Sequence, residues 1–226
     1  MLQTVPQIGK FRIIHQEKKR YTFEDYSSQI GNADAALGIW VHKGVINEKL
    51  FEAHPNLKYI ATLGHGFEDF DVEMTRRRGL TITNTIYGDV TIAQYAMALL
   101  MNICHNVTVQ SDYTKTGYWK EKETNPQASY NQLFVPQIEL YQKTMGIIID
   151  EEALLEALES RKVYMAGLDV VANEPPQYQI PLMQSPYTFI TSHIAWQPKA
   201  ARLRAVDLAV KNFRSYLEGM PTSVIN

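Results

Sequence analysis

A histidine and a glutamate from two separate segments carry the clearest chemistry in this sequence. Glu174 follows an apolar stretch at 164–171, and His193 follows another at 188–192. If these stretches are neighbouring parallel strands, both residues lie at the same edge of the sheet. A carboxylate in that place orients the imidazole ring and holds its proton, so that the histidine can donate to a carbonyl oxygen. The pattern predicts an acid/base pair; the alternative is a structural histidine and a solvated glutamate.

A turn with two glycines, Gly64-His65-Gly66, is the second candidate. It follows the apolar stretch 58–63 and precedes a helical pattern that begins near Asp69. Two glycines before a helix resemble a dinucleotide-binding loop, but Asp69 occupies the third glycine position, where its carboxylate would lie close to a pyrophosphate. Backbone N–H groups at the start of a helix can instead bind a small carboxylate. We favour this small-anion site over a simple tight turn and over a cofactor loop.

Other kinds of catalytic site find no support in the sequence. The other five histidines, none of which has metal-ligand spacing, are His15, His42, His54, His65 and His105, so no metal site is expected. Cys104 lies in a helical apolar stripe, which predicts a buried, inert thiol rather than a nucleophile. The chain also lacks the nucleophile elbow of hydrolases and the phosphate loop of NTPases.

The composition is that of a folded protein with little net charge. The 226 residues include 22 basic and 24 acidic side chains, unlike the basic surface of a nucleic-acid binder. A hydrophobic fraction of 45% is enough for a core, and the single cysteine excludes a disulfide framework. No apolar run reaches the roughly 18 residues of a membrane helix, and no signal peptide is evident. These features predict a cytoplasmic protein without nucleic-acid or membrane partners.

Strand and helix patterns alternate along the chain, which is typical of an α/β fold with a largely parallel sheet. Strands are expected at 11–15, 36–41, 58–63, 80–83, 143–149, 164–171 and 188–192. Helices are expected at about 22–30, 47–54, 69–78 and 92–107, from Asp150 onward, and over 203–217 with a stop at Gly219. One junction is unusual, because the strand at 143–149 meets the N-cap Asp150 without the turn residues usual in such connections.

Five groups of segments, taken in their order along the chain, resemble one enzyme family. They are 55–60 with 64–71, 91–95 with 98–100, 143–148, 150–154 with 166–170, and 193–196 with 200–202. They are similar to the substrate loop, the dimerisation helix, the first nucleotide-domain strand, the closing segments and the histidine signature of the D-isomer-specific 2-hydroxyacid dehydrogenases. The glycerate/hydroxypyruvate reductase branch is the most similar. The resemblance implies a flavodoxin-like parallel-sheet substrate domain, a doubly wound nucleotide-binding domain and a homodimer.

The resemblance is interrupted between Ile148 and Asp150. In the family, a G-x-G-x-x-G loop, further βα units and an N-x-x-R-G segment precede the helix that begins here at Asp150. About ninety residues are therefore expected to be absent, roughly three supersecondary units of about 30 residues each. The absent part would hold the phosphate-binding glycines, the ribose-binding acid and the arginine that pairs with the substrate carboxylate.

The resemblance also implies roles for individual residues. His193 would be the general acid/base and Glu174 its orienting carboxylate. Asp169 matches an aspartate near the nicotinamide amide and would be a vestigial cofactor contact. The residues expected to bind the substrate carboxylate are Lys43, Leu63, Gly64, His65 and Gly66.

Three functional hypotheses follow. The first is a truncated dehydrogenase of small D-2-hydroxy acids that binds neither NAD nor NADP and has no turnover. Residues 1–100 and 195–226 would form its substrate-binding domain, and 101–194 the dimerisation helix and the remnant of the NAD-binding domain. The second is a working 2-keto acid reductase whose cofactor site another chain completes. The third is a non-catalytic module that binds carboxylates or dimerises; an FMN-binding flavodoxin is disfavoured because 16–19 lacks a phosphate loop.

Overall fold

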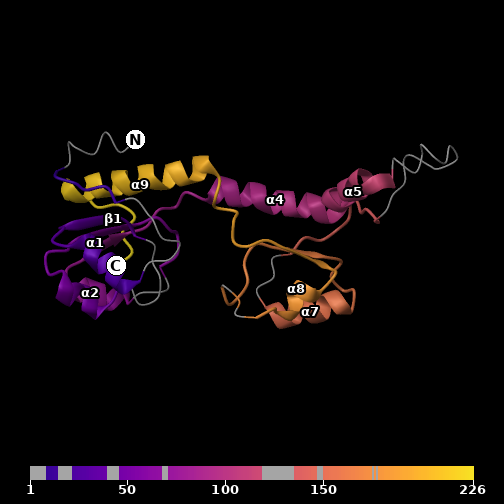
Figure 1. The fold of residues 1–226 in the computed structure, drawn as a ribbon, viewed down its shortest axis with the longest axis horizontal. Helices are drawn as coiled ribbons and strands as arrows, with labels where there is room; N and C mark the ends of the chain where they lie inside the picture. Colours follow the sequence, from indigo (N-terminus) through magenta and orange to yellow (C-terminus); the bar gives the residue numbers. More distant parts are fainter. Residues whose placement is uncertain are drawn as a thin grey trace. The chain divides into compact units, whose positions relative to one another are not determined.

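The computed structural model describes residues 9–14, 22–39, 46–67, 71–118, 135–146, 150–174, 176 and 178–226. The chain forms two compact units, drawn as a ribbon in Figure 1. The first unit comprises Met1–Val90 and Gln197–Asn226, and the second comprises Thr91–Trp196.

A parallel three-stranded sheet forms the centre of the first unit. Its strands β1 (Ala35–Ile39), β2 (Tyr59–Thr62) and β3 (Thr81–Thr83) lie in that order. The central strand β2 is buried along its whole length, as expected of a parallel strand covered on both faces. The predicted α/β fold with a parallel sheet is confirmed.

Four helices in the described part of the first unit cover this sheet. They are α1 (Phe23–Ile30), α2 (Glu48–Ala53), α3 (Val72–Arg77) and α9 (Lys199–Leu217). Figure 1 shows α9 on one face of the sheet and α1 and α2 on the other. The predicted cap of α2 is confirmed, because the Asn47 side chain accepts a hydrogen bond from the N–H of Leu50. The predicted stop after α9 is also confirmed: Gly219 follows it with a φ of 76°, a conformation that favours glycine.

Successive side chains of β2 point to opposite faces of the sheet, so β2 contributes to a hydrophobic core on each face. Ile60 packs with buried residues of α2, α3 and β3 in a nine-residue cluster. Tyr59 and Ala61 point to the other face and pack against α9, where the Tyr59 ring lies 5.0 Å from the ring of Phe213. The C-terminal helix therefore completes the core of the first unit.

The second unit contains a parallel pair of strands and several helices. After α4 (Asp89–His105), which begins in the first unit, come α5 (Val107–Tyr113) and the π-helical turn η2 (Thr114–Tyr118). Then follow α7 (Glu151–Glu159), β4 (Ala166–Leu168), α8 (Pro181–Gln184) and β5 (Thr188–Ile190). The predicted cap of α7 is confirmed, since the Asp150 carboxylate accepts a hydrogen bond from the N–H of Ala153 at 2.9 Å.

Two expected strands differ from the structure in their described parts. Residues 11–14 and 143–146 have no regular secondary structure and belong to neither sheet. A strand pattern becomes a strand only where a neighbouring strand accepts its backbone hydrogen bonds, and these stretches make no such ladder. His15 and residues 147–149 lie outside the described part of the chain. Within the described part, no helix is both long and apolar enough to span a lipid bilayer.

Candidate functional site

The register of the two strands in the second unit brings the predicted site residues to one edge. Leu168 of β4 pairs with Ile190 of β5, so the next residues, Asp169 and Thr191, lie side by side where both strands end. The Thr191 hydroxyl donates to Oδ1 of Asp169 at 2.6 Å. The carboxyl end of a parallel sheet is where α/β proteins usually place their functional groups.

His193 and Glu174 meet at this edge, as the sequence predicts. Nδ1 of His193 lies 2.6 Å from Oε2 of Glu174. The side chains are 56% and 30% exposed, respectively, so the pair is accessible to a small molecule. With the ring proton on Nδ1, the imidazole donates to the carboxylate, and Nε2 is left with a lone pair.

The backbone of His193 has a left-handed conformation, with a φ of 55°. This region is unusual for a residue with a side chain and requires support from its surroundings. Asp169 provides that support. Its carboxylate accepts hydrogen bonds from the N–H groups of Ile194 at 3.0 Å and Ala195 at 2.8 Å, and its carbonyl accepts one from the N–H of His193 at 2.7 Å.

The sequence alone did not predict that Asp169 holds the backbone of the loop around His193. A carboxylate can accept about four hydrogen bonds, and three of those of Asp169 come from Thr191, Ile194 and Ala195. The only available signal was that Asp169 and Thr191 lie within the last three residues of the strand patterns 164–171 and 188–192. The expected contact of Asp169 with a nicotinamide stays a prediction.

The other predicted substrate residues belong to the first unit. Residues 63–66, here the 63–66 loop, directly follow β2. The carbonyl of Gly64 accepts a hydrogen bond from the N–H of Thr85 at 3.1 Å, and that of His65 accepts one from the Asn84 side chain at 2.8 Å. The loop is thus fixed to the segment after β3 through its carbonyl groups. Lys43 lies outside the described residues.

The residues from Gly146 to the start of α7 do not fit the phosphates of a dinucleotide. Phosphate loops use glycines and a helix N-terminus whose N–H groups and positive dipole face the ligand. Here three isoleucines follow Gly146, and three successive carboxylates, those of Asp150, Glu151 and Glu152, stand at the start of α7. Negative charge at that position opposes the binding of a pyrophosphate.

The single cysteine of the chain can also be placed. Cys104 is buried, with 1% of its surface exposed, as predicted for an inert thiol. Among the described residues, no three His, Cys, Asp or Glu side chains are grouped so that they could hold a metal ion.

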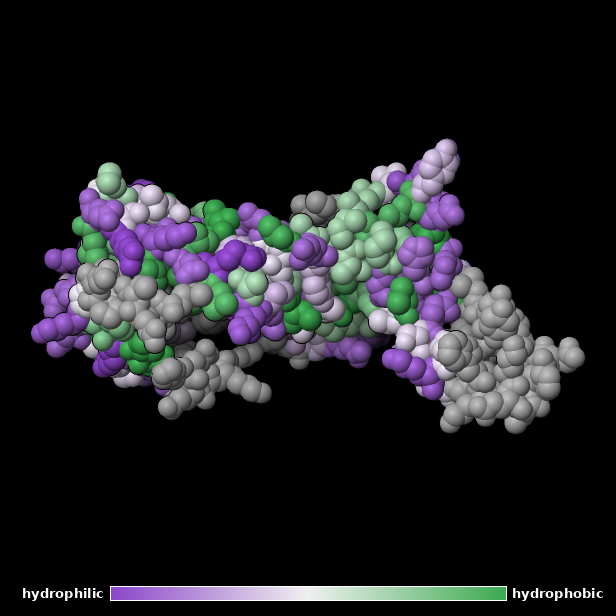
Figure 2. All heavy atoms as spheres, turned by 90° about the horizontal axis from the view of Figure 1, so that it is seen from above, coloured by the Kyte–Doolittle hydropathy of each residue, from purple (hydrophilic) through white to green (hydrophobic). Residues whose placement is uncertain are grey.

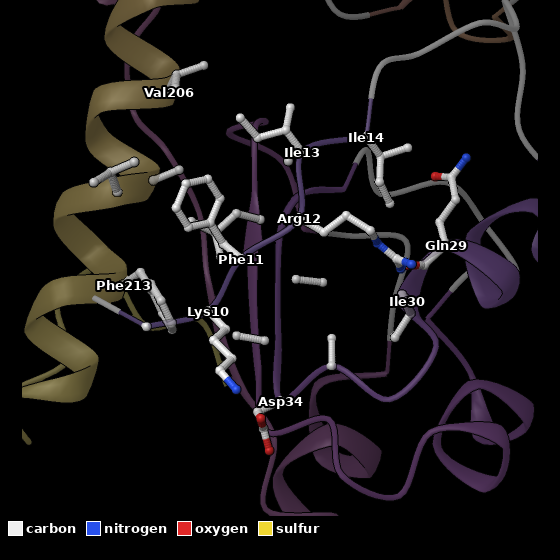
Figure 3. A pocket seen from close by; sticks show the side chains of 18 of the residues that line it. Lys10, Phe11, Arg12, Ile13, Ile14, Gln29, Ile30, Asp34, Val206 and Phe213 are labelled. Carbon is white, nitrogen blue, oxygen red and sulfur yellow. The ribbon is translucent and has the colours of Figure 1, made fainter. Parts of the chain in front are cut away.

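A cavity of about 920 Å³ lies in the first unit beside β1, the edge strand of the sheet (Figure 3). Phe11 and Ile13 from the segment 9–14 line it, together with Phe213 of α9. The side chains of Phe11 and Ile13 are 45% and 46% exposed. Residues of the segment 9–14 and of β1 therefore both line the cavity.

Comparison with known proteins places the chain in a family. Residues 7–226 match the family described as D-isomer specific 2-hydroxyacid dehydrogenase, catalytic domain. A hydroxypyruvate reductase from Blautia hydrogenotrophica is 26% identical over 302 aligned positions, which cover 95% of this chain and 91% of that protein. A glyoxylate reductase from Thermofilum pendens is 22% identical, covering 95% of this chain and 88% of the relative.

Solved structures share the fold. A Thermus thermophilus protein superimposes with a TM-score of 0.75 at 20% identity, covering 100% of this chain and 96% of the other. An NADPH-dependent glyoxylate/hydroxypyruvate reductase from Sinorhizobium meliloti gives a TM-score of 0.70 at 18% identity, covering 99% and 93%. These likenesses confirm the predicted α/β, flavodoxin-like fold class. By its sequence, this chain belongs to the D-isomer-specific 2-hydroxyacid dehydrogenase family, as the resemblance of its motifs indicated.

Proposed function

We propose that this chain carries the proton-transfer half of a D-2-hydroxyacid dehydrogenase site. His193 is its general acid/base and Glu174 the carboxylate that orients the ring. The observation that carries the proposal is the 2.6 Å contact between Nδ1 of His193 and Oε2 of Glu174. This contact leaves Nε2 to exchange a proton with the oxygen of a substrate.

A small 2-keto or 2-hydroxy acid is the substrate class of the proposal. Support comes from relatives that are named hydroxypyruvate reductase and glyoxylate reductase. In this proposal the backbone of the 63–66 loop and the side chain of Lys43 bind the carboxylate of the acid. The fixed carbonyl groups of Gly64 and His65 support this role, because they hold the loop backbone in one arrangement.

The second part of the proposal is that most of the nucleotide-binding domain is deleted between Ile148 and Asp150. The alignment with the Blautia relative spans 302 positions, more than the 226 residues of this chain, so the relative has residues without a counterpart here. The carboxylates at the start of α7 also oppose phosphate binding. In this proposal the chain alone binds neither NAD nor NADP, and its place of action is the cytoplasm.

Calorimetric titration of NADH into the folded protein tests the deletion. The protein should melt cooperatively and give no saturable heat with NADH, and a hydroxypyruvate assay with NADH or NADPH should show no turnover. Saturable binding at micromolar NADH would overturn this part of the proposal. It would favour a working reductase whose cofactor site is completed by another chain.

Self-association is a further part of the proposed function. The helix α4 exposes large hydrophobic side chains at Ile92, Met97 and Met101, which are 49%, 51% and 36% exposed. Hydrophobic surface over α4 is visible as green and pale green spheres in Figure 2. Exposed apolar surface of this kind is typical of contacts between protein chains, so we assign the homodimer contact to α4.

A further inference from the structure

The segment that carries Glu174 is held by a carboxylate from a different element. Glu151, the first residue of α7, accepts a hydrogen bond from the backbone N–H of Ala172, with Oε1 and N 2.5 Å apart. The preceding amide, that of Val171, donates to Oε1 of Glu174 at 2.9 Å. Two consecutive N–H groups therefore bind two different carboxylates.

These hydrogen bonds form a continuous connection to the imidazole. Oε1 of Glu174 is fixed by the amide of Val171, which leaves Oε2 to contact Nδ1 of His193. Ala172 lies in the sequence between Val171, whose amide binds Glu174, and Glu174 itself. Its hydrogen bond to Glu151 limits rotation of the peptide groups on which the direction of Glu174 depends.

The carboxylates at the start of α7 have different tasks. Asp150 caps the helix through the N–H of Ala153. Glu151 is half-buried and reaches the Ala172 amide, whereas Glu152 is exposed. Both glutamates lie in the first turn and gain alike from the helix dipole, so Glu152 is a matched control for the charge of Glu151.

We propose that Glu151 is a positioning residue for the His193–Glu174 pair. Through its hydrogen bond to Ala172, it fixes the segment in which Glu174 points at Nδ1 of His193. The inference rests on the proposed function, since it concerns the pair that acts as acid/base there. It predicts that loss of the acceptor at position 151 changes the proton position on a ring that Glu151 does not itself touch.

Nitrogen-15 NMR of the His193 ring in the full chain, at a pH where the ring is neutral, tests the inference. In the unmodified protein the proton should lie on Nδ1. Glu151→Ala should shift the ring toward the Nε2–H tautomer and speed hydrogen exchange at the Val171 amide, whose own acceptor is unchanged. Glu151→Gln should keep the original tautomer, because the amide oxygen can still accept from Ala172. Glu152→Ala should leave both signals unchanged.

The possible outcomes separate this inference from the proposed function. If His193 of the unmodified protein carries its proton on Nε2, the proposed acid/base pair is wrong. If that proton is on Nδ1 and the Glu151→Ala protein, folded by its cooperative melting, gives the same spectrum, only the role of Glu151 is wrong. A Glu151→Gln protein that behaves like Glu151→Ala would also overturn the inference, since charge and not a hydrogen-bond acceptor would then matter.

Discussion

The loop around His193 depends on one carboxylate. A left-handed backbone at a residue with a side chain costs of order 1–3 kcal/mol, and the φ of His193 is 55°. The hydrogen bonds of Asp169 to Thr191, Ile194 and Ala195 offset this cost. At the scale of single residues, Asp169 thus holds the backbone of the His193 loop, and Glu174 contacts the ring itself.

Asp169→Asn should destabilise the second unit by about 1–3 kcal/mol, because an amide NH₂ would face N–H donors that now bind a carboxylate oxygen. Chemical denaturation with His193 followed by NMR measures the effect. Asp112→Asn, at an exposed position of α5, is the control for the loss of one charge. Equal denaturation midpoints for Asp169→Asn and the unmodified protein would contradict the assigned role.

A second residue-scale prediction concerns Tyr59, which is fully buried and hydrogen-bonded to the Thr83 hydroxyl at 2.7 Å. Burial raises the pKa of Tyr59 to about 12, from an ordinary value of 10. The folded state therefore disfavours the phenolate. The stabilisation that results is complete below pH 10 and is lost as the pH rises through 12.

Tyr59→Phe tests this pH dependence. At pH 8 the substitution should lower the free energy of unfolding by about 1 kcal/mol, because the hydrogen bond to Thr83 is lost. The difference in the free energy of unfolding between the two proteins should shrink as the pH rises from 10 to 12. Only the unmodified protein has a phenol at position 59, so only it loses the stabilisation that the neutral phenol provides. Tyr141→Phe, at a side chain that is 76% exposed, is the control. A difference that stays constant up to pH 12 would refute the assignment.

At the scale of elements, a glycine sets how closely α4 packs on β4. A Cβ atom added at Gly167 would lie 3.0 Å from Cβ of Leu99 and from Cδ1 of Ile103. The Cβ atom of Leu99 is attached to the helix backbone and cannot move away without shifting α4. A small residue is therefore required where the helix crosses the strand.

Gly167→Ala should lower the free energy of unfolding by about 1–3 kcal/mol, because the added methyl group overpacks the contact with α4. Gly167→Val should lower it more. Urea denaturation of the second unit, with hydrogen exchange in α4 and β4, measures the loss. Gly146→Ala is the matched control, since an added Cβ atom there meets nothing within 4 Å. The close packing of α4 on β4 would be disproved by a Gly167→Ala protein as stable as this control.

At the scale of the whole molecule, the small net charge of −2 opposes association only weakly, and α4 offers apolar surface. We therefore expect the proposed self-association to depend on side chains of α4 rather than on overall charge. Met97 and Met101 are one helical turn apart and both are exposed.

Sedimentation velocity should show a dimer that the double substitution Met97→Glu, Met101→Glu converts to a monomer. Carboxylates at these positions would have to be desolvated in the interface, which is unfavourable. Gln184→Glu adds negative charge at an exposed position of α8 and should leave the dimer intact. A double variant that still sediments as a dimer would show that association uses another surface.

The elements that the sequence predicts well are those governed by neighbouring residues. The caps Asn47 and Asp150 each bind an amide three residues along the chain, and Gly219 ends α9 through its own backbone freedom. The strands predicted at 11–14 and 143–146 do not form, because strand formation is not governed by neighbouring residues. A strand requires a partner, and no local pattern specifies whether that partner is in reach.

The features of the candidate site also fall into those predictable from local sequence and those set by tertiary packing. The sequence by itself determined that His193 and Glu174 could form an acid/base pair, because residue type and position at a strand end suffice for that hypothesis. Only the tertiary structure decided that Asp169 holds the loop of His193 and that Glu151 reaches the amide of Ala172. These contacts depend on the register of β4 with β5 and on the placement of α7 beside them. Packing between elements distant in sequence fixes both, and short-range patterns carry no information about it.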